Sequence, residues 1–143
     1  MSDSRYTDNG DGTVTDTETK LIWAREDSWQ TETIWVTWDE AEKYNDRIND
    51  IKPGGFNDWR MPNRLEGKTL YCPDKTIKDK YGNDLYMDPV FPQGGLPTIW
   101  LHEPMTGNDG YILDLRNGEI RTLYKSKSGR MAVRPVRGSY DLA

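Results

Sequence analysis

The chain has 143 residues, of which 34% are hydrophobic and 30% charged, with a formal net charge of -5 and a pI near 4.9. This length suits one domain, spanning residues 1–143, that buries a core without disulfides or metals. The acidic balance argues against nucleic-acid and anionic-membrane partners, because both would repel the chain. Six Trp and eight Tyr residues argue against disorder and predict an aromatic-rich core.

Membrane anchoring and disulfide chemistry also find no support in the sequence. No segment approaches the roughly 20 apolar residues of a membrane-spanning helix, and the first residues lack the apolar run of a signal peptide. The single cysteine, Cys72, excludes an intrachain disulfide and is expected to be a small buried hydrophobe. The chain as it stands is expected to be soluble and unanchored, while its compartment and its relation to a longer precursor stay open.

Residues 8–24 are expected to form a β-hairpin. The β-prone runs Thr13–Thr15 and Leu21–Trp23 flank the polar turn Asp16–Lys20. The run Asp8–Gly12 resembles a fragment of a calcium loop, but the later ligands and closing glutamate of an EF-hand are missing. Asn-Gly and Asp-Gly are preferred tight-turn dipeptides, so we interpret this run as a turn and expect no metal.

A helix is predicted from about Trp38 to Ile51. Thr37 and Glu40 have the spacing of a capping box, and Pro53-Gly54 ends the helical pattern. Apolar residues recur at steps of three and four, which predicts one buried stripe. The stripe consists of Trp38, Ala41, Tyr44 or Asn45, Ile48 and Ile51.

The segment Gly54–Asn63, with the sequence G-G-F-N-D-W-R-M-P-N, is predicted to be a buried crossing point. Its glycines permit unusual backbone angles, and Pro62 excludes a continuing helix or central strand. We interpret Trp59 as a core anchor, in preference to a ligand site. The charges beside it, Asp58 and Arg60, are expected to satisfy nearby backbone groups or each other.

This segment is similar to the G-x-x-D-W-R-L-P-N signature of the Lcl C-terminal domain family, a bacterial family of mostly unassigned function. Further matches follow in the same order along the chain, at Asp8–Asp16, Leu21–Trp23, Thr37–Ala41 and Arg134–Arg137. The resemblance implies an α+β, C-type-lectin-like fold with antiparallel β-sheet, one to two helices and long loops. It also implies an exported or cell-surface protein, with a structural signature formed by Asp58, Trp59, Arg60 and Pro62.

Between the signature and the last strands, the pattern is weaker. Asn63–Glu66 is expected to open a second short helix, as in the family, although Gly67 weakens it and Leu65-Glu66 reverses the family's usual order. Residues Tyr71–Pro97 lack periodicity and contain several Pro and Gly residues, which predicts a long loop. Loops of this length tend to be functional or mobile.

The rest of the chain is expected to form antiparallel strands at Thr98–Leu101, Tyr111–Leu115, Ile120–Tyr124 and Met131–Arg134. Asn117-Gly118 predicts a two-residue hairpin turn. Counting out from it places Arg116 opposite Glu119 and Asp114 opposite Arg121, which are complementary charges. The face expected to lie toward the core carries Tyr111, Leu113, Leu115, Ile120, Thr122 and Tyr124.

Catalytic and metal chemistry have few candidate residues. His102 is the only histidine, no serine lies in a nucleophile-elbow pattern, and no acidic pair stands out by its spacing. Glu103-Pro104-Met105 approaches the Glu-Pro-Asn motif of calcium-dependent lectins, but Met105 places a thioether where a hard cation needs oxygen. The family's fold is distantly similar to that of formylglycine-generating enzymes, which work through a pair of cysteines. This chain has one cysteine, so that activity is not expected. We therefore expect no enzyme, no cofactor and no metal.

The expected function is a non-enzymatic binding module that recognises a glycan or protein ligand at a surface, without calcium, through loops on a rigid scaffold. The alternative is a structural domain for protein–protein contact or oligomerisation, and the oligomeric state stays open. A buried Trp100 and a merely solvated turn at Lys125–Arg130 are the competing interpretations of the candidate site. Its predicted ligand-binding residues, suited to a sulfated or uronic sugar, are Trp100, His102, Glu103, Lys125, Lys127 and Arg130.

Overall fold

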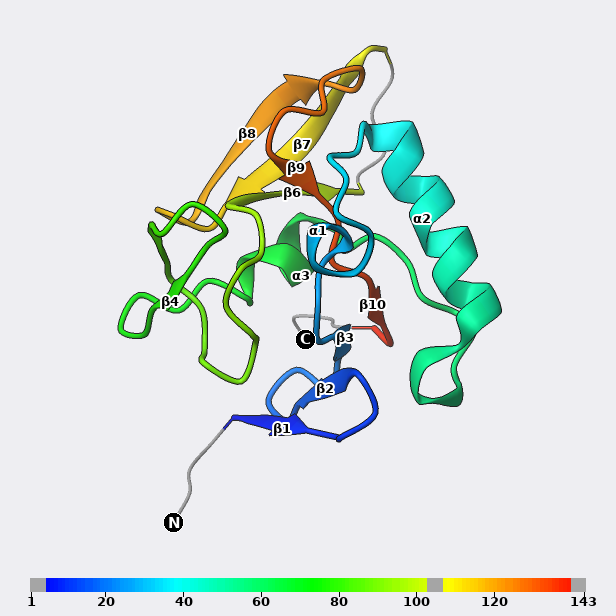
Figure 1. Cartoon of the computed structure of the whole chain (residues 1–143), viewed down its shortest axis with the longest axis vertical. Helices are drawn as coiled ribbons and strands as arrows, with labels where there is room; N and C mark the ends of the chain where they lie inside the picture. The colour runs from blue at the N-terminus through cyan, green and yellow to red at the C-terminus, as the bar shows by residue number, and fades with distance from the viewer. Residues whose placement is uncertain (1–4, 103–106, 140–143) are drawn as a thin grey trace.

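A computed structural model describes residues 5–102 and 107–139. It shows the α+β fold expected from the sequence, with three α-helices, two four-stranded sheets and one two-stranded sheet among the described residues (Figure 1). The helices are α1 (Ser28–Glu32), α2 (Trp38–Ile51) and α3 (Arg64–Lys68), and a 3-10 turn covers Pro53–Gly55. No helix of the described part of the chain is long and apolar enough to cross a membrane.

The first sheet combines the first three strands of the described chain with its last strand. Its order is β1-β2-β3-β10, with β1 at Tyr6–Asp8, β2 at Thr13–Asp16, β3 at Ile22–Ala24 and β10 at Val136–Arg137. The β2–β3 hairpin confirms the sequence prediction, whereas β1 was missed. The predicted turn between β1 and β2 is also confirmed, because the Asp8 carboxylate accepts from the Gly10 amide at 2.9 Å.

The second sheet has the order β8-β7-β6-β9 and contains one parallel pair. Its strands are β6 (Thr98–Leu101), β7 (Asp109–Asp114), β8 (Glu119–Tyr124) and β9 (Met131–Ala132). β9 runs parallel to β6, with Met131 opposite Thr98, so the expectation of antiparallel strands alone is wrong. The segment 125–130 carries the chain back to the beginning of β6, where the Thr98 hydroxyl donates to the Arg130 carbonyl at 2.7 Å.

The β7–β8 register differs from the sequence prediction by two residues. Asp114 lies opposite Glu119, and four residues rather than two connect the strands. Leu115 leaves the ladder because its amide donates to the Pro97 carbonyl at 2.8 Å and its side chain is buried. The expected attraction between Asp114 and Arg121 survives as a contact of 3.1 Å.

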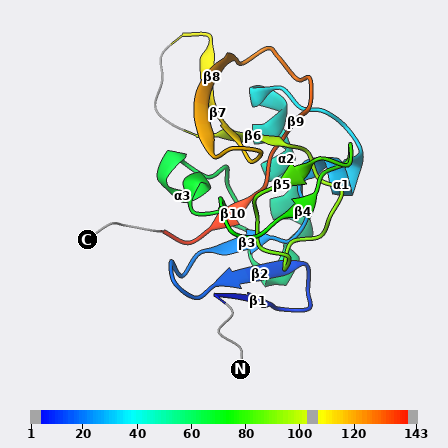
Figure 2. The same ribbon diagram turned by 90° about the vertical axis from the view of Figure 1, so that its left-hand side faces the viewer.

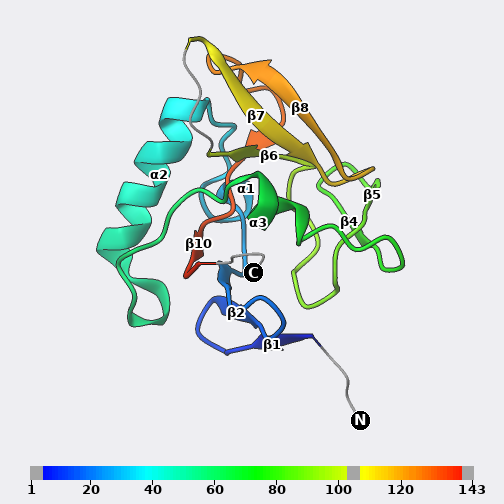
Figure 3. The same ribbon diagram turned by 180° about the vertical axis from the view of Figure 1, so that it is seen from behind.

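Both faces of this sheet are covered, which corrects the predicted core face. Trp100 and Ile112 face a cluster that includes Tyr44 of α2, whereas Leu101 and Leu113 face a cluster on the side of α3 (Figure 3). β8 lies at the edge of the sheet, so Thr122 and Tyr124, which were expected to be buried, are exposed.

Both predicted helices are confirmed, and so is the predicted capping box at Thr37, whereas the one at Asn63 was not predicted. The Thr37 hydroxyl accepts from the Glu40 amide at 3.2 Å, and Asn63 caps α3 in the same way. Ile51 is 71% exposed, so the predicted stripe ends one turn earlier, at Ile48. The sequence analysis missed α1, although Asp27 and Gln30 form a third capping box.

The segment Tyr71–Pro97 is not an open loop. It contains the short antiparallel pair β4 (Ile77–Lys78) and β5 (Asp84–Leu85) and covers one face of the second sheet (Figure 2). Cys72, expected to be a small buried hydrophobe, is half-buried beside Asp74, and burial raises the pKa of its thiol. The segment buries Ile77, Leu85, Met87, Phe91 and Leu96.

Candidate functional site

Trp59 is a core anchor, as the sequence predicted. Its side chain is 2% exposed, and its indole N–H donates to the Phe56 carbonyl at 3.1 Å. Asn49 of α2 binds both backbone groups of Trp59, accepting from its amide at 2.7 Å and donating to its carbonyl at 2.9 Å. The segment is therefore fixed to α2 by hydrogen bonds as well as by packing.

The charges beside Trp59 form ion pairs with Arg137 and Glu66 and not with each other, and Arg60 also donates to the neighbouring Met61 carbonyl at 3.4 Å, as expected. Asp58 binds Arg137 of β10 at 2.7 Å, and Arg60 makes two bonds of 2.7 Å with the buried carboxylate of Glu66 in α3. Pro62 is buried, and its carbonyl accepts from the His102 amide at 2.7 Å. Asp58, Arg60 and Pro62 therefore tie β10, α3 and the end of β6 to the signature.

One predicted ligand-binding residue, Trp100, is not available to a ligand, and another, Glu103, is not described by the structure. Trp100 is fully buried and its indole N–H donates to the Val36 carbonyl at 2.9 Å, so its assignment as a ligand contact is wrong. The physical reason is that β6 is an inner strand of a sheet covered on both faces. Glu103 lies outside the described residues, as do Pro104 and Met105 of the same motif.

Trp38, the first residue of α2, brings two other predicted residues together. The Lys125 ammonium lies 4.3 Å from the centroid of the Trp38 ring, and the His102 ring stacks against Trp38 at 6.0 Å between centroids. Gly110 of β7 provides the space, because a Cβ there would lie 3.1 Å from the rings of both Trp38 and Trp100. Sequence analysis placed Trp38 in the apolar stripe of α2. Its position as the first residue of that helix was the available signal that it lies at the edge of the core.

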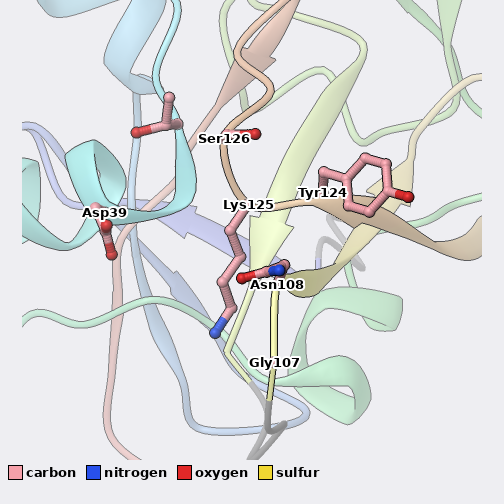
Figure 4. Close-up of a pocket in the computed structure, with 7 residues that line it drawn as sticks. Asp39, Gly107, Asn108, Tyr124, Lys125 and Ser126 are labelled. Atoms are coloured by element: carbon pink, nitrogen blue, oxygen red, sulfur yellow. The ribbon is translucent and has the colours of Figure 1, made fainter.

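A polar groove opens beside these residues, where the start of α2 meets the ends of the β7–β8 hairpin. We call it the Lys125 groove. Its volume is about 630 Å³. In Figure 4 the Lys125 side chain extends past Asn108, whereas the Tyr124 ring points away from it. The groove is lined by Thr37, Asp39, Gly107, Asn108, Tyr124, Lys125 and Ser126.

The remaining basic residues of the predicted site are not gathered at this groove. Arg130 lies 4.9 Å from the centroid of the Tyr81 ring, and Tyr81 belongs to the segment Tyr71–Pro97. Lys127 is exposed in the turn that follows β8. His102 also lines a smaller hollow of about 190 Å³ with Arg60 and Asn63. The structure thus joins His102 and Lys125 through Trp38 and separates Arg130 from them.

The Lys125 groove offers hydroxyl, amide, carboxylate and ammonium groups, which together donate and accept several hydrogen bonds. Within residues 5–102 and 107–139, no group of three or more His, Cys, Asp and Glu side chains is arranged to hold a metal ion. The chemistry that this arrangement provides is recognition of a polar ligand by hydrogen bonds beside a cation on an aromatic ring.

Comparison with known proteins gives one result. A search among curated proteins finds no match to this chain. The family comparison matches residues 12–137, which include the signature, the β2–β3 hairpin, the three described helices and every residue that lines the Lys125 groove. The chain belongs to the Lcl C-terminal domain family.

Proposed function

We propose that this domain is a non-enzymatic binding module that recognises a glycan in the Lys125 groove without calcium. The observation that carries the proposal is the groove itself, a hollow of about 630 Å³ whose polar groups come from the start of α2, the residues just before β7, and the end of β8 with the turn after it. Convergent polar groups in a concave site are the usual arrangement for small-ligand recognition. A sugar presents many hydroxyls that such groups bind.

The charges of the groove support a sugar that carries an acidic substituent. The Lys125 ammonium is held over Trp38, where it is positioned for a sulfate or carboxylate, and exposed Lys127 is two residues away. Asp39 and Asn108 provide acceptors and donors for neighbouring hydroxyls. Local charge governs contact at short range, because physiological salt screens the acidic remainder of the protein over about 8 Å.

The family resemblance supports the same class of function. We propose on that basis that the fold is C-type-lectin-like and that the protein acts as an adhesin-like module at a bacterial surface. In such folds a rigid core presents variable segments to a ligand. The Lys125 groove lies where the start of α2, the residues Gly107 and Asn108 before β7, and the turn after β8 meet.

Titration calorimetry with dextran sulfate and with unsulfated dextran tests the proposal. We expect the wild-type protein to bind the sulfated chain, and Lys125→Ala to weaken that binding about tenfold, which corresponds to about 1.4 kcal/mol. Arg130→Ala is the matched control, because Arg130 lies on Tyr81 outside the groove, and it should bind like the wild type. Equal affinity of the wild type and Lys125→Ala would remove the groove as the site.

A further inference from the structure

β8 is the longest edge strand in the described part of the chain. Its six residues, Glu119–Tyr124, lie at one end of the order β8-β7-β6-β9, whereas the edge strands β1, β9 and β10 have three, two and two residues (Figure 3). β8 contains neither proline nor glycine. A regular exposed edge of this length is a template for another strand, and proteins usually protect such edges.

The hydrogen bonds to β7 show which backbone groups of β8 face outward. The Lys125 amide donates to the Asn108 carbonyl at 2.7 Å, which continues the β7–β8 register. Antiparallel pairs alternate between bonded and non-bonded, so Ile120, Thr122 and Tyr124 direct their N–H and C=O groups away from β7. No described residue accepts from these three N–H groups. The Tyr124 carbonyl accepts one bond, from the Lys127 amide, and retains a second lone pair.

We propose that two copies of this chain associate through β8, antiparallel, about a two-fold axis at Thr122. Thr122 of one copy then lies opposite Thr122 of the other, and their outward N–H and C=O groups bond to each other. Ile120 faces Tyr124, and Glu119 faces Lys125. The association joins the two four-stranded sheets into one continuous sheet, and the two-fold axis makes the interface self-complementary.

Charge complementarity selects this register from its neighbours. Only even-numbered residues of β8 direct backbone groups outward, so an even-numbered residue of one copy must lie opposite an even-numbered residue of the other. Neighbouring registers therefore differ by two in the sum of the numbers of the two opposite residues. One step in one direction places Arg121 opposite Arg121, and one step in the other places Arg121 opposite Lys125. Like charges directly opposite each other destabilise a pair of strands, whereas Glu119 opposite Lys125 stabilises it.

The same register places an exposed side chain against a hollow. Tyr124 is 60% exposed, and its opposite residue in the second copy is Ile120. Ile120 borders a hollow of about 600 Å³ in which Leu65 is 39% exposed. The Tyr124 ring also suits Arg64 and Lys68 of this hollow, because cations bind the face of an aromatic ring. The hollow is lined by Arg64, Leu65, Lys68, Tyr111 and Ile120.

Sedimentation velocity without sugar tests the association, over a dilution series from about 500 μM to about 1 μM. We expect the wild type to be dimeric at the high end and to dissociate on dilution. Thr122→Pro removes the central outward N–H without removing a bond to β7, so it should be monomeric throughout. Thr122→Ala keeps that N–H and should still dimerise. A wild type that is monomeric throughout the series, or a Thr122→Pro dimer as tight as the wild type, would overturn the proposal.

A charge exchange tests the register independently of any folding defect. Glu119→Lys should weaken the dimer about tenfold by opposing two lysines, and Lys125→Glu should do so by opposing two glutamates. The double variant with both changes restores opposite charges and should recover most of the wild-type affinity. A double variant weaker than both single variants would contradict this register. Lys125 also lines the Lys125 groove, so the readout is the oligomeric state alone, and it is independent of the glycan proposal.

Discussion

At the residue scale, the central feature is a set of side chains that link distant parts of the chain around Trp59. Sequence analysis identified Trp59 as the core anchor and named the charges beside it. It could not identify their partners, Arg137 and Glu66, because these lie far along the chain or on a helix of uncertain register. Composition and local pattern indicate that a charge must be satisfied, and only the fold determines by which residue.

Removal of the Trp59 ring should be among the most costly single changes. We expect Trp59→Ala to lower the free energy of unfolding by about 3–5 kcal/mol, because it empties a large buried aromatic site. Chemical denaturation measures this change. Ile51→Ala, at a side chain that is 71% exposed, is the matched control and should change stability by less than about 0.5 kcal/mol. Equal stability of the wild type and Trp59→Ala would show that Trp59 is not the anchor.

Asp114 should contribute stability that depends on pH. Burial raises its pKa, but hydrogen bonds from Arg116 and Arg121 outweigh burial, so the folded-state pKa is lower than the ordinary value. The stabilisation is therefore complete above the unfolded-state pKa, near 4, and is lost as the pH falls through the folded-state pKa. Unfolding free energies measured from pH 7 to pH 2 should fall less steeply below pH 4 in Asp114→Asn. Parallel curves for the two proteins would contradict this role.

At the scale of elements, local signals predicted helices better than strand pairing. The capping boxes at Thr37 and Asn63 act within one helical turn, so the sequence alone located both helix starts. The Asn117-Gly118 turn was predicted with the wrong register, because the bond from Leu115 to Pro97 is a tertiary contact. The parallel β6–β9 pair was missed for the same reason, since neither strand contains a signal for the other.

The Thr37 cap should have a measurable effect on stability. We expect Thr37→Ala to cost about 1 kcal/mol, because the Glu40 amide loses its acceptor at the start of α2. Lys43→Ala, on the exposed face of the same helix, is the control and should be nearly neutral. Thermal or denaturant unfolding of the two variants makes the comparison. A cost for Lys43→Ala as large as that for Thr37→Ala would show that the cap is not responsible.

At the scale of the whole molecule, the family resemblance implied the α+β fold class that the structure shows, but the sequence did not predict the arrangement of the site. Trp100 was predicted to be an aromatic contact of the loop surface, but β6 is covered on both faces and the side chain is buried. Lys125 and Trp38 are far apart in sequence, and the fold places them in contact. The segment Tyr71–Pro97 was predicted as a loop because its buried residues have no regular period.

The folded domain is predicted to need no calcium. Asp8 and Asp11 use their carboxylates within the β1–β2 turn, where Asp11 accepts from the Thr13 hydroxyl at 2.6 Å. We expect thermal unfolding curves recorded with calcium and with excess chelator to overlay. An increase of several degrees with calcium would demonstrate a site, because a ligand that binds only the native state stabilises it by mass action.

The most direct test of the central claim, that the Lys125 groove binds an acidic glycan, is an NMR titration of isotopically labelled protein with a dextran sulfate oligosaccharide. We predict that the largest shifts with added sugar occur at the amides of Thr37, Asp39 and Asn108 and at the Trp38 indole N–H, and that unsulfated dextran produces smaller shifts at the same positions. Shifts confined to the segment Tyr71–Pro97, or no shifts at sugar concentrations of about 1 mM, would contradict the assignment of the Lys125 groove as the binding site.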